Sequence, residues 1–358
     1  MSSKKLWFGS DYQEFAHEKI LQRMLEVSRT HHSGYGHDDI TASATDKIRK
    51  AIANEEADIV FLTGGTQTNQ TIIDTMCAPY EGVIAAETGH VSVHEAGAIE
   101  FSGHKVLTLP SHEGKIHADE LCSYIDTFYA DANHDHMVFP GMVYISHPTE
   151  YGTLYTTEEL KKLHEICEAH KIPLFLDGAR LGYALAAARN SEEKIYPSLP
   201  EIAANSDVFY IGGTKVGALY GEAVVFTQKN QPAHFETRIK QHGALLAKGF
   251  ACALQFDELF TDDLYQKISQ NAVTFAMEIK QALIQKGYRL YLDSPTNQQF
   301  FIVPNDMLDD LSADVVYSYM ERYDENHTVI RFCTSWATTK EDVDALLAQL
   351  PPILSGNS

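Results

Sequence analysis

The chain has 358 residues, 44% of them hydrophobic, so it is long enough to bury a large core and to form two domains. Its net charge of -21 argues against nucleic acid or an anionic membrane surface as a partner. The five cysteines form no Cys-x-x-Cys pair, and the sequence shows neither a signal-peptide pattern nor a run of roughly 18 apolar residues. We therefore expect a cytoplasmic protein.

Short apolar runs rich in β-branched and aromatic residues alternate with helical patterns through the first two thirds of the chain. This order predicts an α/β fold with a mostly parallel seven-stranded sheet between helices. The predicted strands span residues 58–63, 82–87, 104–110, 141–146, 172–177, 206–212 and 221–226. Residues 156–171 predict a helix with Leu160, Leu163 and Cys167 on one face.

A different pattern follows residue 249. It predicts a long helix over 262–286, strands at "YRLYL" and "QQFFIV", a helix near 311–321, a strand at "HTVIRFCT" and a last helix near 340–350. The aromatic run "YSYMERY" (317–323) is interpreted as half-buried helix packing. We expect an N-terminal segment (1–15), a large domain (16–249) and a small α+β domain (250–358).

The first candidate site motif is "FLTGGTQTNQTIID". A predicted strand runs into Gly64 and Gly65, and the next helix opens at Thr66. Backbone N–H groups at such a turn bind phosphate in many proteins. Glycine pairs are also common in ordinary strand-to-helix turns, so both interpretations stay open.

Two later strand ends carry charged side chains. In "IPLFLDGARLGYAL" a strand ends at Asp177, and Arg180 follows; they are suited to a heterocyclic nitrogen and a carboxylate, or to capping and mutual pairing. In "FYIGGTKVGALYGE", Lys215 lies among glycines and small apolar residues, where desolvation favours a neutral amine; a solvent-facing loop lysine is the alternative. A phosphate cradle, an aspartate and a lysine together are what pyridoxal phosphate (PLP) requires.

The ordered motifs "TGGTQTN", "ETGHVSVHEAGA", "FLDGAR" and "GGTKVGAL" resemble the low-specificity L-threonine aldolases of the β-eliminating lyase family, which have the aspartate-aminotransferase-like fold type I. "FGSDYQEF", "SGYGHDDIT" and "VIRFCTSW" extend the resemblance over almost the whole chain. It implies a PLP-dependent enzyme that cleaves threonine, allo-threonine or phenylserine to glycine and an aldehyde, working as a homo-oligomer, either a dimer or a tetramer.

The resemblance also implies roles for individual residues. Lys215 would form the Schiff base, Asp177 would hold the pyridinium proton and His90 would stack on the cofactor ring. Further implied cofactor-binding residues are Gly64, Gly65, Thr66, Arg180, Thr214 and Lys248, the last from a neighbouring subunit. The implied substrate-binding residues are Ser10, Tyr35, Arg180 and Arg331.

Two positions depart from the family pattern. Thr214 stands where serine is common before the lysine, and Glu150, in "HPTEYGT", stands where the family has a histidine. The catalytic base is therefore open between Glu150, a nearby histidine and a water bound to the cofactor phosphate. The same Lys, Asp and Arg set also serves β-elimination and amino-group transfer, and a PLP-binding protein without turnover is a further alternative.

Two histidine-rich segments were considered as metal sites. They are His31, His32, His37, Asp38 and Asp39, and the segment "NHDHM" at 133–137. Neither has the i, i+4 ligand spacing of a hydrolytic zinc site, so we expect no metal, and we place His134 and His136 on a solvated loop.

Overall fold

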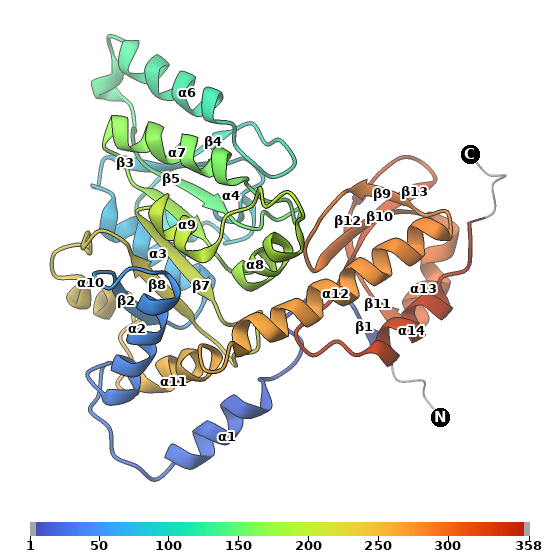
Figure 1. Cartoon of the computed structure of the whole chain (residues 1–358). Coiled ribbons are helices and arrows are strands. Elements are labelled where there is room, and N and C mark those ends of the chain that lie inside the picture. Colours follow the sequence, from blue (N-terminus) through green and yellow to red (C-terminus); the bar gives the residue numbers. More distant parts are fainter. Residues whose placement is uncertain (1–4, 354–358) are drawn as a thin grey trace.

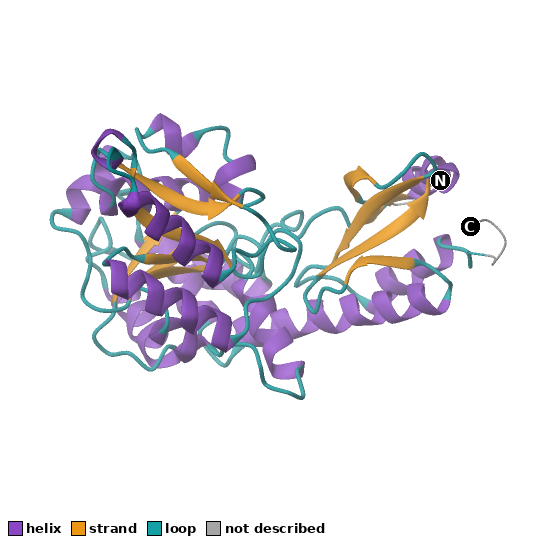
Figure 2. Cartoon of the chain, turned by 90° about the horizontal axis from the view of Figure 1, so that it is seen from above, coloured by secondary structure: helices purple, strands orange, loops and turns teal. Residues whose placement is uncertain are grey.

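A computed structural model describes residues 5–353 and divides them into a large and a small part, with the long helix α12 (Leu264–Gln285) extending along both (Figures 1 and 2). The large part is built on a seven-stranded sheet of order β2-β8-β7-β6-β5-β3-β4. Its strands are β2 (Asp58–Leu62), β3 (Glu81–Ala86), β4 (Val106–Leu109), β5 (Phe139–Ser146), β6 (Leu174–Asp177), β7 (Val208–Gly212) and β8 (Glu222–Phe226). All seven predicted strands are confirmed.

The sheet is parallel except for β8, which runs antiparallel to both of its neighbours, β2 and β7. Its two faces are both covered, as the apolar strand sequences predict. Along β5, Val143 and Ile145 face one buried apolar cluster, whereas Met142 and Tyr144 face the other. This alternation follows from the two-residue repeat of a strand.

Helices cover both faces of this sheet (Figure 1). The helices of the large part are α1 (Glu18–Val27), α2 (Asp39–Ala51), α3 (Gly65–Met76), α4 (His90–Val93), α5 (Ala98–Phe101), α6 (Ala118–Ala130), α7 (Thr157–His170), α8 (Leu181–Asn190), α9 (Leu199–Ala204), α10 (Phe235–Gln241) and α11 (Phe250–Leu259). The predicted helix at 156–171 is confirmed as α7. Thr156 and Glu159 form a capping box at its start, and its apolar face is buried as expected.

The small part has an antiparallel sheet of order β12-β13-β10-β9. Its elements are β9 (Arg289–Leu292), β10 (Gln298–Pro304), α13 (Leu308–Asp314), β12 (Ser318–Arg322), β13 (His327–Cys333) and α14 (Lys340–Gln349). The first strand of the chain, β1 (Leu6–Trp7), pairs with β11 (Val315–Val316) in this part. The N-terminal segment therefore joins the C-terminal core, where Phe8 is buried beside Ile330 and Phe332.

The prediction of a helix over 311–321 is wrong in its second half. The helix α13 ends at Asp314, and residues 318–322 form the edge strand β12, which pairs with β13. The interpretation of "YSYMERY" as half-buried helix packing is wrong for the same reason: Tyr319 lies on that strand and is 64% exposed. Pairing with a strand that follows in the sequence outweighs the local helical pattern.

The domain boundaries at residues 15/16 and 249/250 stay predictions. α11, which follows the second boundary, packs against α1 and α2 of the large part. Asp257 on this helix accepts a hydrogen bond from Ser43 at 2.6 Å and pairs with Lys47. No helix within residues 5–353 has both the length and the apolar character needed to cross a membrane.

Candidate active site

A small cavity opens where β5, β6 and β7 end at their carboxyl edge. In an open α/β sheet this edge is the usual place for a ligand. The residues that line the cavity are Gly65, Asn69, His90, Ser146, Pro148, Glu150, Asp177, Ala179, Arg180, Tyr210 and Lys215. The structure thus brings together six of the residues predicted for the site, although they are spread over 150 positions of the chain.

Asp177, the last residue of β6, is the most firmly held side chain in the cavity. Its carboxylate accepts hydrogen bonds from Tyr144 Oη at 2.5 Å, Asn69 Nδ2 at 3.1 Å and the backbone N–H of Ala179 at 3.0 Å. Burial opposes ionisation, but the charge of His90 and the hydrogen bonds outweigh it and lower the pKa of Asp177. The carboxylate therefore stays ionised and suits a cationic N–H group.

His90 opens α4, and its ring is fixed by a buried glutamate. Nδ1 lies 2.8 Å from Glu95 Oε1, which also accepts a hydrogen bond from Asn69 Nδ2 at 2.6 Å. Burial disfavours the charged ring, yet the Glu95 hydrogen bond and the charge of Asp177 raise the pKa of His90. Asn69 Nδ2 donates hydrogen bonds to the carboxylates of both Glu95 and Asp177. The position of the His90 ring is therefore fixed relative to the Asp177 side chain.

Lys215 follows β7 by three residues, and its ammonium group is destabilised. Burial and the nearby charge of Arg180 lower the pKa of Lys215, although Asp11, Asp177 and Glu222 oppose this. The backbone carbonyl of Lys215 accepts a hydrogen bond from Tyr183 Oη at 2.5 Å. The segment is thus anchored while the side-chain amine is biased toward its neutral, nucleophilic form.

Glu150 lines the cavity and is held through one carboxylate oxygen. Its Oε1 accepts hydrogen bonds from the backbone N–H of His90 at 2.9 Å and from Ser146 Oγ at 2.7 Å. Its Oε2 is buried and has no hydrogen-bond partner within residues 5–353. Burial raises the pKa of Glu150, and a carboxylate with one unpaired oxygen in such a place is a competent proton acceptor.

Two further histidines, His147 in the segment that carries Glu150 and His94 beside His90, differ in burial and in pKa. His147 is buried, its Nδ1 accepts the backbone N–H of Tyr155 at 3.3 Å, and burial lowers its pKa to about 3. His147 does not line the cavity. His94 is exposed, with its ring centroid 5.7 Å from that of His90. Burial and the charges of His90 and Arg331 lower the pKa of His94.

The two arginines expected to bind substrate differ in the charge of their hydrogen-bond partners. Arg180 makes a two-pronged pair with Asp11, with distances of 2.7 and 3.1 Å, and Asp11 is completely buried. Within residues 5–353, the hydrogen bonds of Arg331 go to neutral acceptors: Gln298 Oε1 at 2.8 Å, the carbonyl of Gly9 at 3.1 Å and Ser318 Oγ at 3.0 Å. Ser10 lies between Gly9, which accepts a hydrogen bond from Arg331, and Asp11, which pairs with Arg180.

Other predicted residues lie beside the cavity or away from it. Gly64 is the N-cap of α3 and Thr66 follows Gly65 in the same first turn. Thr214 precedes Lys215, but its hydroxyl group donates to Glu222 Oε1 at 2.9 Å. Tyr35 and Lys248 are exposed, and the backbone N–H of Tyr35 bonds to the carbonyl of Ala247. Both lie outside this chain's cavity.

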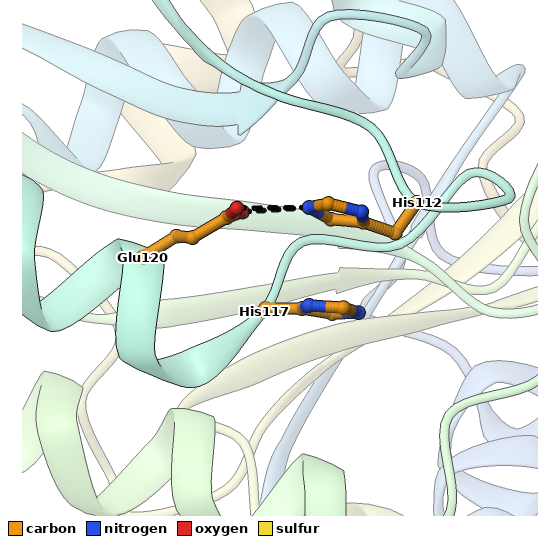
Figure 3. Close-up of side chains that lie close together, drawn as sticks. All are labelled: His112, His117 and Glu120. Carbon is orange, nitrogen blue, oxygen red and sulfur yellow. Dashed lines mark hydrogen bonds and ion pairs between the residues drawn. The ribbon is translucent and has the colours of Figure 1, made fainter.

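One group of side chains within residues 5–353 has the composition of a metal site: His112, His117 and Glu120 (Figure 3). The two imidazole rings stack with centroids 3.9 Å apart and planes within 11° of parallel. In-plane lone pairs on parallel rings do not converge on one ion, and Glu120 instead pairs with His112 Nε2 at 2.9 Å. Of the histidines considered from sequence, His134 and His136 form a short 3-10 helix rather than a loop.

Sequence reasoning missed the residues that hold the site together: Asp11, Asn69, Glu95, Tyr144, Tyr210 and Glu222. Five of them, all except Tyr144, lay inside quoted motifs without being recognised as site residues. Asn69 occurs in "TGGTQTN", one helical turn beyond Gly65 and so on the same helix face, and Asp11 follows Ser10 in "FGSDYQEF". Their partners are 108 and 169 positions away, which the sequence gives no means of matching.

Comparison with known proteins places this geometry in a family. The model of the β-eliminating lyase family matches residues 8–300. The low specificity L-threonine aldolase of Pseudomonas aeruginosa is 29% identical, with 95% of each chain covered, and that of a Pseudomonas species is 28% identical, with 99% of this chain and 100% of the relative covered.

The solved structures agree. The threonine aldolase of Leishmania major superposes with a TM-score of 0.90 at 38% identity, covering 96% of this chain and 97% of the other. A serine palmitoyltransferase structure that holds PLP shares the fold, with a TM-score of 0.68 at 13% identity. On its cavity, its fold and the matched length, the chain belongs to the β-eliminating lyase family.

Proposed function

We propose that the chain is a PLP-dependent aldolase that cleaves the Cα–Cβ bond of a β-hydroxy-α-amino acid, giving glycine and an aldehyde. The observation that carries the proposal is the meeting of Lys215, Asp177 and His90 around one cavity. Relatives named as threonine aldolases, matched over 95% or more of the chain, support it.

Residues in and beside the cavity suit three groups of PLP, namely the aldehyde, the ring nitrogen and the phosphate. Lys215, with its lowered pKa, suits the aldehyde, and the ionised Asp177 suits the ring nitrogen. Gly64 caps α3 without a side-chain hydrogen bond, so the first N–H groups of a twelve-residue helix are available to a phosphate. When bound, PLP supplies an electron-withdrawing ring that takes up the electron pair released at Cα.

The other roles in the reaction, which are substrate binding and proton transfer, fall to side chains of the protein. Arg331, whose charge no carboxylate neutralises among its hydrogen-bond partners, binds the substrate carboxylate. Glu150 Oε2 accepts the proton of the β-hydroxyl group as the Cα–Cβ bond breaks and the aldehyde C=O forms. With PLP bound, His90 would pack beside its ring, and Asp177 would keep its ring nitrogen protonated.

Product identification tests the activity. Purified protein with added PLP is incubated with threonine, allo-threonine and phenylserine, and glycine and the matching aldehyde are quantified. We expect both products in equal amounts, and none from Lys215→Ala. Ammonia with a keto acid would instead indicate elimination or amino-group transfer. Bound PLP without any turnover would indicate a binding protein.

The role of Glu150 is tested with the isosteric Glu150→Gln variant. We expect kcat to fall by about 10²- to 10⁴-fold, the usual contribution of a positioned base. Because the pKa of Glu150 is raised, the wild-type rate should climb with pH as the carboxyl group ionises, and the variant should lose this climb. Ser146→Ala, which keeps the carboxylate, is the matched control. An unchanged kcat in Glu150→Gln would transfer the role to His94.

We also propose that the active form is a homo-oligomer, a dimer or a tetramer, in which Tyr35 and Lys248 complete the cavity of a neighbouring subunit. Their exposure and their distance from this chain's own cavity support the idea. Mixing inactive Lys215→Ala chains with impaired Lys248→Ala chains should restore activity, because hybrid oligomers contain one intact site. No recovery after subunit exchange would contradict it.

A further inference from the structure

Glu222 is a buried carboxylic acid that the proposed reaction does not use. It begins β8 at the edge where the cavity lies, and it is 3% exposed. Its register partners are Leu62 on β2 and Gly212 on β7. The first strand leads into the turn at Gly64 and Gly65, and the second leads to Lys215. Glu222 therefore lies between the two segments proposed to hold the cofactor.

Glu222 makes its side-chain hydrogen bond with one threonine, and the backbone of Gly213 also favours its ionised form by lowering its pKa. Thr214 Oγ1 donates to Glu222 Oε1 at 2.9 Å and accepts the backbone N–H of Gly221 at 3.0 Å. Glu222 Oε2 is buried without a hydrogen-bond partner anywhere in residues 5–353. An ionised carboxylate with a bare buried oxygen is costly, whereas a protonated one loses much of that cost.

The surrounding groups favour the protonated form near neutrality. Burial raises the pKa of Glu222 to about 8; the Thr214 hydrogen bond and the charge of Lys215 oppose the shift, and the charge of Asp177 adds to it. The other titratable groups that face Glu222 are Tyr210, Cys252 and Tyr265. Burial raises the pKa of each of these three, so they remain neutral while Glu222 titrates.

We propose that Glu222 is a positioning residue for the cofactor phosphate and acts by setting the direction of the Thr214 hydroxyl group. The proposal rests on the proposed PLP-dependent function. An ionised Glu222 takes the single hydroxyl proton of Thr214, which then has none to offer a phosphate. A protonated Glu222 donates its own O–H to Thr214 Oγ1. That oxygen then accepts from Gly221 and Glu222, and its proton is free for the phosphate.

The exchange is an acid–base equilibrium with solvent, in which only O–H bonds form and break. It also suits the charges present. A neutral carboxyl group beside a phosphate avoids the repulsion that two anions in a dry site impose on one another. Thr214, one of the two departures from the family pattern, thereby becomes the link between a proton and the affinity for the cofactor.

The test measures the Kd of the apo-protein for PLP and for pyridoxal between pH 6.5 and 9.5. In the wild type, we expect PLP binding to weaken through about pH 8 by roughly tenfold more than in Glu222→Gln, the effect of one hydrogen bond to a charged group. The glutamine amide donates to Thr214 at every pH, so its curve lacks this step. Pyridoxal has no phosphate, so both proteins should give parallel pyridoxal curves.

Three results would overturn the proposal. The first is a wild-type PLP curve parallel to that of Glu222→Gln. The second is an equal effect of the substitution on pyridoxal, because Glu222 would then act on Lys215 and not through Thr214. The third is a persistent step near pH 8 in Thr214→Val, which lacks the hydroxyl group and serves if Glu222→Gln does not fold; Thr214→Ser should keep the step.

Failure of the PLP dependence on which the proposal rests gives a separate signal. Wild-type protein would then form no borohydride-reducible linkage with PLP at any pH, and no affinity would be measurable. Linkage to Lys215 with no pH step attributable to Glu222 would leave the proposed function intact and reject only the role of Glu222.

Discussion

Arg180 and Arg331 both bind the segment from Gly9 to Asp11, but their electrostatic surroundings are opposite. Arg180 is paired with a fully buried aspartate, Asp11, which neutralises it before any ligand arrives. Arg331 is held by a carbonyl, an amide and a hydroxyl group, and its Nε is buried without a partner within residues 5–353. Arg180 therefore already has its counter-charge, whereas Arg331 has none among its hydrogen-bond partners, which is why we propose it for binding an anionic substrate group.

The largest expected effect comes from breaking the neutralised pair. Arg180→Ala leaves Asp11 buried without its counter-charge and should lower the free energy of unfolding by about 3–5 kcal/mol, measured by urea denaturation. The matched control is Arg180→Met with Asp11→Leu, which removes both charges and should recover much of the loss. A cost below about 1 kcal/mol in the single variant would mean that Asp11 is not the partner that matters.

Replacing Arg331 should weaken substrate binding and leave the stability of the fold nearly unchanged. Arg331→Gln keeps a polar side chain but loses the charge, so we expect KM for the amino acid to rise by roughly 10- to 100-fold, equivalent to 1.5–3 kcal/mol for hydrogen bonds to a charged group. The urea midpoint and the Kd for PLP should change little. Ser318→Ala removes a neutral partner and is the control. A loss of stability as large as that of Arg180→Ala would mean that Arg331, like Arg180, mainly stabilises the fold.

The pair of Asp11 and Arg180 should also make the stability of the protein depend on pH in the acidic range. Burial opposes ionisation of Asp11, but the charges of Arg180 and Lys215 lower its pKa from 3.8 to about 2. A depressed pKa means that the folded state binds the proton less tightly, so this contribution is complete above pH 3.8 and is lost as pH falls toward 2. It amounts to roughly 2 kcal/mol. In Asp11→Asn the stability curve should be flatter over this window.

The smallest expected effect lies between the two arginines. Ser10 is buried, and its hydroxyl group is proposed to add one hydrogen bond to the substrate carboxylate. Ser10→Ala should raise KM by roughly three- to tenfold, the value of a typical single hydrogen bond, and leave the acid stability curve of the Asp11 pair unchanged. A large loss of stability would assign Ser10 to the structural side of the comparison.

The sequence predicted what depends on local pattern. Each of the seven strands of the large sheet was recognisable from short apolar runs, and Asp177 and Lys215 followed because parallel strands deliver their ends to one edge. The partner of Arg180 was not recognisable: its pairing with Asp177 was one open alternative, yet it bonds to Asp11 across 169 positions. The edge strand β12 was missed likewise, because β13 supplies its hydrogen bonds.

The pairing of β1 with β11 has a consequence for how the enzyme is made. Leu6 and Trp7 pair with Val315 and Val316, and Gly9 accepts a hydrogen bond from Arg331. These early residues can therefore adopt their native positions only after residues 315–331 have been synthesised. Contacts so distant in sequence close late and slowly. A nascent chain that stops before Val315 would hold Lys215 and Asp177 already synthesised, with Arg331, the arginine proposed to bind substrate, still missing.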